Sequence, residues 1–106
     1  MKFAFLILRT DFKPENDKAF IGSGLAQIIG VSSIQEACTE AKKLMDEEIS
    51  CIELCGAFGP EGAKKVITAT YNQLPIGYVT HLQEQDIIFR KTFGEWDKKL
   101  FSLQRL

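Results

Sequence analysis

Three residues of this 106-residue sequence have side chains that could do chemistry together, namely Glu53, Cys55 and His81. Glu53 and Cys55 are two positions apart in an apolar segment, so on an extended strand they share one face. His81 is the single histidine, and histidine is the side chain whose ordinary pKa suits proton transfer near neutral pH. A carboxylate, a thiol and an imidazole at one place would suit proton transfer or nucleophilic attack, so all three are candidate catalytic residues.

Each of these residues also has a structural explanation. Glu53 lies between two apolar residues, so its carboxylate needs either a cation such as Arg9 or a role in a site. Cys55 ends an apolar strand, where simple packing explains a thiol. His81 would also fit as a loop residue bonded to backbone. The sequence has neither Cys-x-x-Cys nor His-x-x-x-His spacing, and we expect no metal and no cofactor.

Four apolar segments are expected to form the strands of one sheet. Residues 3–8 are a continuous apolar run, which predicts a central strand covered on both faces. Residues 25–31, 50–55 and 75–81 predict three further strands, which start at nearly equal intervals. Residues 19–21 form a short extended piece before a Gly-Ser-Gly turn.

Three helices are expected between and after these strands. Ser33 and Glu36 form a capping box that opens the first helix, and an apolar stripe follows it, opposite a polar face that includes Glu40. Pro60 suits the start of a second helix, and residues 84–93 predict a third. Repeated strand–helix units predict an α/β fold, a single domain of two or three layers with a mostly parallel four-stranded sheet. An antiparallel first strand or a ferredoxin-like arrangement remains an alternative.

A ligand of such a sheet is expected beyond the carboxyl ends of the strands. The candidate ligand-binding residues there are Arg9, Ser32, Gly56, Phe58, Gly59 and Thr80. The glycine-rich turn over residues 56–62 could present backbone N–H groups to an anion at a helix start. The alternative is a tight turn in which the glycines supply unusual backbone angles, with Glu61 favouring the helix dipole.

The C-terminal region has an apolar stripe at helical spacing. Its residues are Phe89, Phe93, Trp96, Leu100 and Leu103. We therefore divide the chain into an α/β domain over residues 1–94 and a helical tail over residues 95–106, which packs on the domain or on another subunit and makes a homo-oligomer the expected state.

Composition excludes several classes of partner. The net charge is −1, with 13 Lys and Arg against 14 Asp and Glu, which lacks the basic excess of a nucleic-acid-binding protein. The longest apolar run is far shorter than the roughly 20 residues that cross a bilayer, and the start of the sequence does not fit a secretory leader. Three cysteines are an odd number, which favours the reducing cytoplasm, and Cys51 and Cys55 are too far apart on a strand for a disulfide.

Three blocks of the sequence resemble a domain-of-unknown-function family of short bacterial proteins. They are the segments over residues 26–33, AQIIGVSS, residues 51–63, CIELCGAFGPEGA, and residues 77–81, GYVTH, with Gln85 and Asp86 after the last. The likeness covers about residues 1–94 and is most specific over residues 52–63. It implies a stand-alone domain and no established activity.

Two classes of function follow from these observations. In the first, the protein binds a small polar or anionic metabolite at the strand ends, either without reaction or as a proton-transfer enzyme of isomerase or lyase type that uses Glu53 and His81. In the second, it is a non-catalytic oligomeric or adaptor domain that binds a protein partner through its C-terminal apolar stripe.

Overall fold

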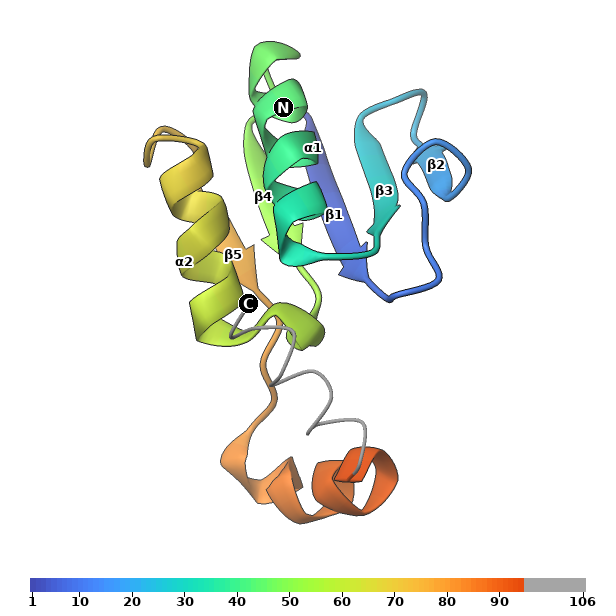
Figure 1. The fold of residues 1–106 in the computed structure, drawn as a ribbon, viewed down its shortest axis with the longest axis vertical. Helices are drawn as coiled ribbons and strands as arrows, with labels where there is room; N and C mark the ends of the chain where they lie inside the picture. Colours follow the sequence, from blue (N-terminus) through green and yellow to red (C-terminus); the bar gives the residue numbers. More distant parts are fainter. Residues whose placement is uncertain (95–106) are drawn as a thin grey trace.

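The computed structural model describes residues 1–94, which form one sheet with two helices packed side by side on it (Figure 1). The strands are β1 (Phe3–Leu8), β2 (Lys18–Ile21), β3 (Ala26–Val31), β4 (Cys51–Leu54) and β5 (Ile76–Tyr78). The helices are α1 (Ile34–Asp46) and α2 (Gly59–Ala69), with short 3₁₀ turns η1 (Gly56–Phe58) and η2 (Gln83–Gln85). Residues 86–94 are helical.

The sheet has the strand order β2-β3-β1-β4-β5. β1 pairs in parallel with β3 and β4, β4 pairs in parallel with β5, and β2 pairs antiparallel with β3. The predicted α/β class and the central position of the first strand are confirmed. The sheet has five strands rather than four, because the extended piece at residues 19–21 is part of β2 and pairs with β3.

One face of the sheet carries the core and makes this a two-layer structure. In β1, Ala4, Leu6 and Leu8 are fully buried beneath the helices. They share one apolar cluster with Ile52 of β4 and Val66 of α2. The continuous apolar run of β1 predicted cover on both faces, but within residues 1–94 the helices cover only one. The alternate residues of the strand are therefore less buried.

Local hydrogen bonds explain where α1 begins. The Ser33 hydroxyl accepts a hydrogen bond from the Glu36 backbone N–H at 3.0 Å, as the capping box predicts. The Glu36 carboxylate reaches one residue farther back than expected and accepts from both the backbone N–H and the hydroxyl of Ser32. α2 has Pro60 in its first turn, where its missing N–H costs no hydrogen bond.

The C-terminal part of the described chain leaves the sheet. β5 ends at Tyr78, earlier than the predicted strand over residues 75–81, and the helical residues up to 94 lie beyond the carboxyl ends of the strands (Figure 1). A helix was predicted at residues 84–93, and it is confirmed. The predicted tail over residues 95–106, with Trp96, lies outside the described residues. No helix within residues 1–94 combines the length and apolar character needed to cross a membrane.

Candidate functional site

Cys55 lies at the switch point of the sheet, between the carboxyl ends of β1 and β4. The chain leaves these two strands in opposite directions, toward β2 on one side and toward α2 on the other (Figure 1). The Cys55 sulfur accepts a hydrogen bond from the Leu8 N–H at 3.3 Å, and the Cys55 N–H donates to the Leu6 carbonyl at 3.0 Å. The half-buried thiol is thus anchored where open α/β sheets hold their ligands.

Glu53 lies on the sheet face away from the helices, and its side chain is exposed. In register it stands between Phe5 of β1 and Gly77 of β5. A Cβ atom placed on Gly77 would be 2.6 Å from the Glu53 Oε2, so the carboxylate lies directly over this glycine. Arg9, the cation that the sequence suggested as a partner of Glu53, forms an ion pair with Asp11 at 3.1 Å.

His81 belongs to the C-terminal segment rather than to a strand. Its Nε2 lies 2.7 Å from the Asp86 Oδ1, and its ring stacks on Phe89 with the centroids 3.8 Å apart. The Phe89 ring in turn lies 5.8 Å from that of Phe93. An imidazole held by a carboxylate on one side and an aromatic ring on its face has a fixed orientation.

The contacts of the three candidate catalytic residues therefore differ. Cys55 contacts β1, Glu53 lies over β5, and His81 contacts residues that follow η2. Within residues 1–94, no group of three or more His, Cys, Asp and Glu side chains is placed to hold a metal ion. The structure places Cys55 and His81 in segments near the carboxyl edge of the sheet, with separate partners.

Several predicted ligand-binding residues hold the loops of this edge together. Ser32 binds the Glu36 carboxylate through its N–H and its hydroxyl, at 2.7 and 2.9 Å. Phe58 is fully buried in the core. Gly56 packs close to the backbone of Val79, whose carbonyl oxygen would lie 3.4 Å from an added Cβ.

The other predicted ligand-binding residues differ in their surroundings. Gly59 is buried at the start of α2 with a φ of 60°. This conformation favours glycine, as the tight-turn alternative expects. Arg9 and Thr80 are the two whose side chains remain exposed at the carboxyl edge.

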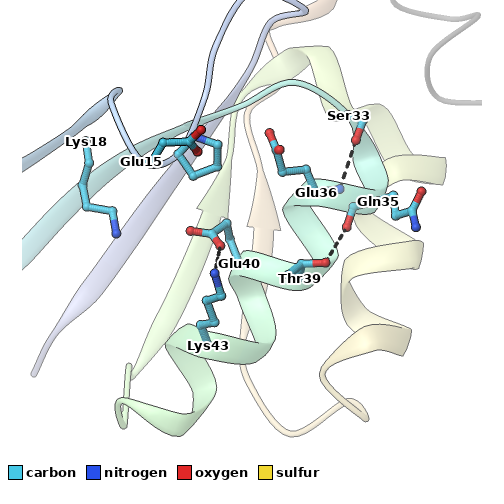
Figure 2. Close-up of a pocket in the computed structure, with 9 residues that line it drawn as sticks. Glu15, Lys18, Ser33, Gln35, Glu36, Thr39, Glu40 and Lys43 are labelled. Atoms are coloured by element: carbon cyan, nitrogen blue, oxygen red, sulfur yellow. Dashed lines mark hydrogen bonds and ion pairs between the residues drawn. The ribbon is translucent and has the colours of Figure 1, made fainter.

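A polar groove lies elsewhere, between α1 and the segment that leads into β2 (Figure 2). It measures about 480 Å³. Its lining combines three carboxylates, two ammonium groups and three neutral polar side chains, with a single proline. The lining residues are Pro14, Glu15, Lys18, Ser33, Gln35, Glu36, Thr39, Glu40 and Lys43.

Glu40 is the buried carboxylate of this groove. Its side chain is only 7% exposed, and it forms an ion pair of 3.0 Å with Lys43, whose side chain is mostly exposed (Figure 2). The helical pattern placed Glu40 on the solvent face of the helix, and that interpretation is wrong. Glu40 is three residues after Ala37 and four before Leu44, both buried, so it flanks the stripe on the β2 side.

The groove is not among the sites that the sequence patterns predict. One signal could have indicated it: Glu40 falls within the angular range of the apolar stripe, where a carboxylate is unexpected. Glu15 and Lys18 gave no comparable signal, because they lie in a polar segment whose position against α1 depends on the pairing of β2 with β3.

The sheet, its two helices and the polar groove define a small two-layer α/β protein. Comparison with known protein families matches residues 1–94 to the family described as "Family of unknown function (DUF6506)", and the chain belongs to this family. The predicted resemblance to a family of unknown function over this range is thereby confirmed. The search of curated proteins and the search of solved structures each gave no match.

Proposed function

We propose that this protein binds a small polar molecule with a cationic group in the groove beside α1. The observation that carries the proposal is the buried carboxylate of Glu40, which opens on a groove of about 480 Å³. Burial of a charged carboxylate costs free energy unless a partner offsets it. Lys43 is a mostly exposed partner, so a ligand ammonium group could replace or supplement it.

The charges of the lining favour a cationic group over an anionic one. Glu15, Glu36 and Glu40 outnumber Lys18 and Lys43. The Glu36 carboxylate already accepts two hydrogen bonds, from the N–H and the hydroxyl of Ser32. Within residues 1–94, neither Glu15 nor Lys18 has a hydrogen bond or ion pair from its side chain, so both are available to a ligand. We therefore place the small-molecule site in the groove beside α1, and not at the strand ends where the sequence had predicted it.

A thermal-shift screen tests this proposal. The probes are putrescine, spermidine, lysine, arginine and glycine betaine, with succinate and phosphate as anionic comparisons. A ligand present at 100 times its Kd adds about 2.7 kcal/mol to the free energy of unfolding. For a domain of this size, that raises Tm by about 10 °C or more.

The Glu40→Gln variant identifies the groove as the site, because it removes the charge with little change of shape. Glu47→Gln is the matched control, since Glu47 is an exposed residue at the end of the same helix. We expect the ligand-induced Tm shift to disappear in Glu40→Gln and to persist in Glu47→Gln. No shift with any cationic probe, or an equal shift in both variants, would contradict the proposal.

Proton transfer at the carboxyl edge is a second candidate, favoured by the 2.7 Å contact between His81 and Asp86. A carboxylate that orients an imidazole is a common arrangement in general acid–base catalysis. In this proposal His81 is the base, Glu53 and Cys55 are further candidates, and Arg9 and Thr80 bind the substrate. If a turnover assay identifies a substrate, we expect His81→Ala to abolish the reaction and Asp86→Asn to slow it. An unchanged rate in His81→Ala would exclude this mechanism.

A cytoplasmic location is part of the same proposal. It is supported by the three free cysteines among the described residues, which would be exposed to oxidation elsewhere. Cell fractionation tests the location. We expect to recover the tagged full chain in the cytoplasmic fraction, and recovery from another fraction would contradict the proposal.

A further inference from the structure

The sheet has one face that no helix of residues 1–94 covers, although the Phe12 ring of the loop after β1 packs on it at Gly30. We call it the uncovered face and define it by Phe3, Phe5, Ile7, Ile21, Ile28 and Cys51. In β1, Phe3, Phe5 and Ile7 alternate with the buried residues and so point away from the helices. The parallel and antiparallel registers align the other three residues of this face beside them.

These residues are apolar but remain in contact with solvent. Phe3 is 42% exposed and Ile21 is 56% exposed, while Phe5, Ile7, Ile28 and Cys51 are half-buried. Parallel strands are normally buried on both faces. β1 thus has a phenylalanine–isoleucine face that the described chain leaves partly exposed, and an apolar surface of this kind is typical of a contact with a further layer.

The charged side chains that the described residues place on this face lie at its margin. Arg9, just after β1, stacks over the Phe12 ring at 5.5 Å. The Glu53 carboxylate lies over Gly77 of the edge strand β5, away from Phe5. The centre of the face is consequently apolar and its margin is charged. This distribution is typical of protein–protein interfaces, which have an apolar centre and a polar rim.

The described C-terminal helix does not cover this face. It lies beyond the carboxyl ends of the strands (Figure 1), and its apolar side chains are themselves exposed. Leu82 is 69% exposed, Ile87 66% and Ile88 56%. The described chain thus presents two apolar surfaces, one on the sheet and one on this C-terminal segment.

We propose that a second copy of this chain covers the uncovered face and that the protein is a homodimer. Two sheets can pack face to face at about 10 Å, and a two-fold axis then places the same patch on both sides. Five strands about 4.8 Å apart and up to about 20 Å long give a face of only about 24 by 20 Å.

A stable dimer commonly buries about 800 Å² of accessible surface from each partner. The sheet face falls near or below this value, so we assign the C-terminal segment, including Ile87 and Ile88, to the margin of the same interface. The net charge of −1 opposes the association of two copies only weakly.

Analytical ultracentrifugation of the full chain over a range of concentrations tests the proposal. We expect a species of twice the 11.9 kDa chain mass. The Phe3→Lys variant places a charge on the uncovered face at a position exposed enough to tolerate it. We expect it to raise the dimer dissociation constant by about tenfold or more.

Phe20→Lys is the matched control. Phe20 is 61% exposed and lies on β2, but its register partner is the buried Gln27, so it points to the helix side of the sheet. The proposal expects Phe20→Lys to remain a dimer. A mass of one chain at every concentration, or equal dissociation constants for both variants, would overturn it.

Alkylation of wild-type cysteines provides a readout that does not depend on any variant folding. We expect Cys51, on the uncovered face, to react at least about tenfold more slowly above the dimer dissociation constant than below it. Cys38 contacts the Lys65 carbonyl of α2 on the other side of the sheet, and its rate should not change. Cys51 protection that is independent of concentration would mean that the chain's own C-terminal residues cover the face, and would refute the dimer.

Discussion

The ring of Phe12 lies directly against Gly30, on the side of β3 that faces away from the helices. A Cβ atom built on Gly30 would be 2.7 Å from the Phe12 Cδ2 and 2.9 Å from its Cγ. The loop after β1 therefore folds back onto the sheet because β3 has a glycine at this position. The Gly30 N–H also donates to the Asp17 carbonyl at 2.7 Å, which ties the same loop to the strand.

The first prediction is that Gly30→Ala destabilises the protein. The added methyl group would overlap a ring whose position is fixed by the loop, and such overpacking costs about 1–3 kcal/mol. Urea denaturation monitored by circular dichroism measures the change. Gly94→Ala is the control, because nothing lies within 4 Å of a Cβ there and that residue is helical. An equal stability of the two variants would show that the Phe12 ring moves freely.

Gly77→Ala is predicted to be milder than Gly30→Ala, although the nominal overlap is slightly closer. The new methyl group would meet the Glu53 Oε2 at 2.6 Å, but that atom is at the end of a flexible, exposed side chain. The carboxylate can rotate into solvent at small cost. We expect a loss below about 1 kcal/mol in the same denaturation experiment. A loss equal to that of Gly30→Ala would mean that Glu53 is held in place by other contacts.

Ser33→Ala is predicted to lower stability by about 1 kcal/mol, because it removes the hydroxyl that caps α1. For a domain of this size, Tm should fall by about 4–8 °C. Ser33→Asp is the control, since a carboxylate can accept the same hydrogen bond and also favours the positive end of the helix dipole. Differential scanning calorimetry of both variants tests the prediction. It fails if Ser33→Asp loses as much stability as Ser33→Ala.

The last prediction concerns alkaline pH. Burial raises the pKa of the Cys38 thiol above its ordinary value of 9.0, with Lys42 and Lys65 acting in the opposite direction. Between the ordinary value and the raised one, the unfolded thiol loses its proton while the folded thiol keeps it. The free energy of unfolding should therefore fall as pH rises through this range.

Denaturation of wild type and Cys38→Ala from pH 8 to 10 isolates this effect, because the other groups titrate equally in both proteins. The wild type should lose stability more steeply as pH rises. Parallel pH profiles of the two proteins would show that Cys38 does not contribute.

The main elements of the fold followed from sequence patterns that have a direct physical meaning. The continuous apolar run of residues 3–8 predicted a central strand, and the capping residues Ser33 and Glu36 predicted the start of α1. Both are confirmed. These patterns are local, and they are repeated over enough residues that tertiary packing did not override them.

The sequence predicted residues 19–21 as an extended piece, but it predicted neither the pairing of this piece with β3 nor the groove. All four residues of β2 are exposed, so the strand has no alternation of apolar and polar residues and depends on its hydrogen bonds to β3. The position of Glu15 and Lys18 against α1 follows from that pairing. Such contacts between distant segments leave no periodic pattern in the sequence.

The positions of the candidate catalytic residues were also predicted only in part from the sequence. Glu53 and Cys55 were expected at the end of one strand, and the structure places them on and directly after β4. His81 was expected to end a strand, but β5 stops at Tyr78. Asp86 is five residues after His81, and both residues follow β5. The alternation of residues that predicts a strand therefore could not indicate their contact.

The central position of β1 has a consequence for the order in which the chain is made. β1 needs β3 on one side and β4 on the other, so both its edges are paired only after residue 54 of 106 has been synthesised. Until then, the nascent chain carries an apolar strand with at least one unpaired edge. Because such edges invite pairing with other chains, the yield of soluble protein should depend on how quickly residues 51–54 follow residues 3–8 from the ribosome.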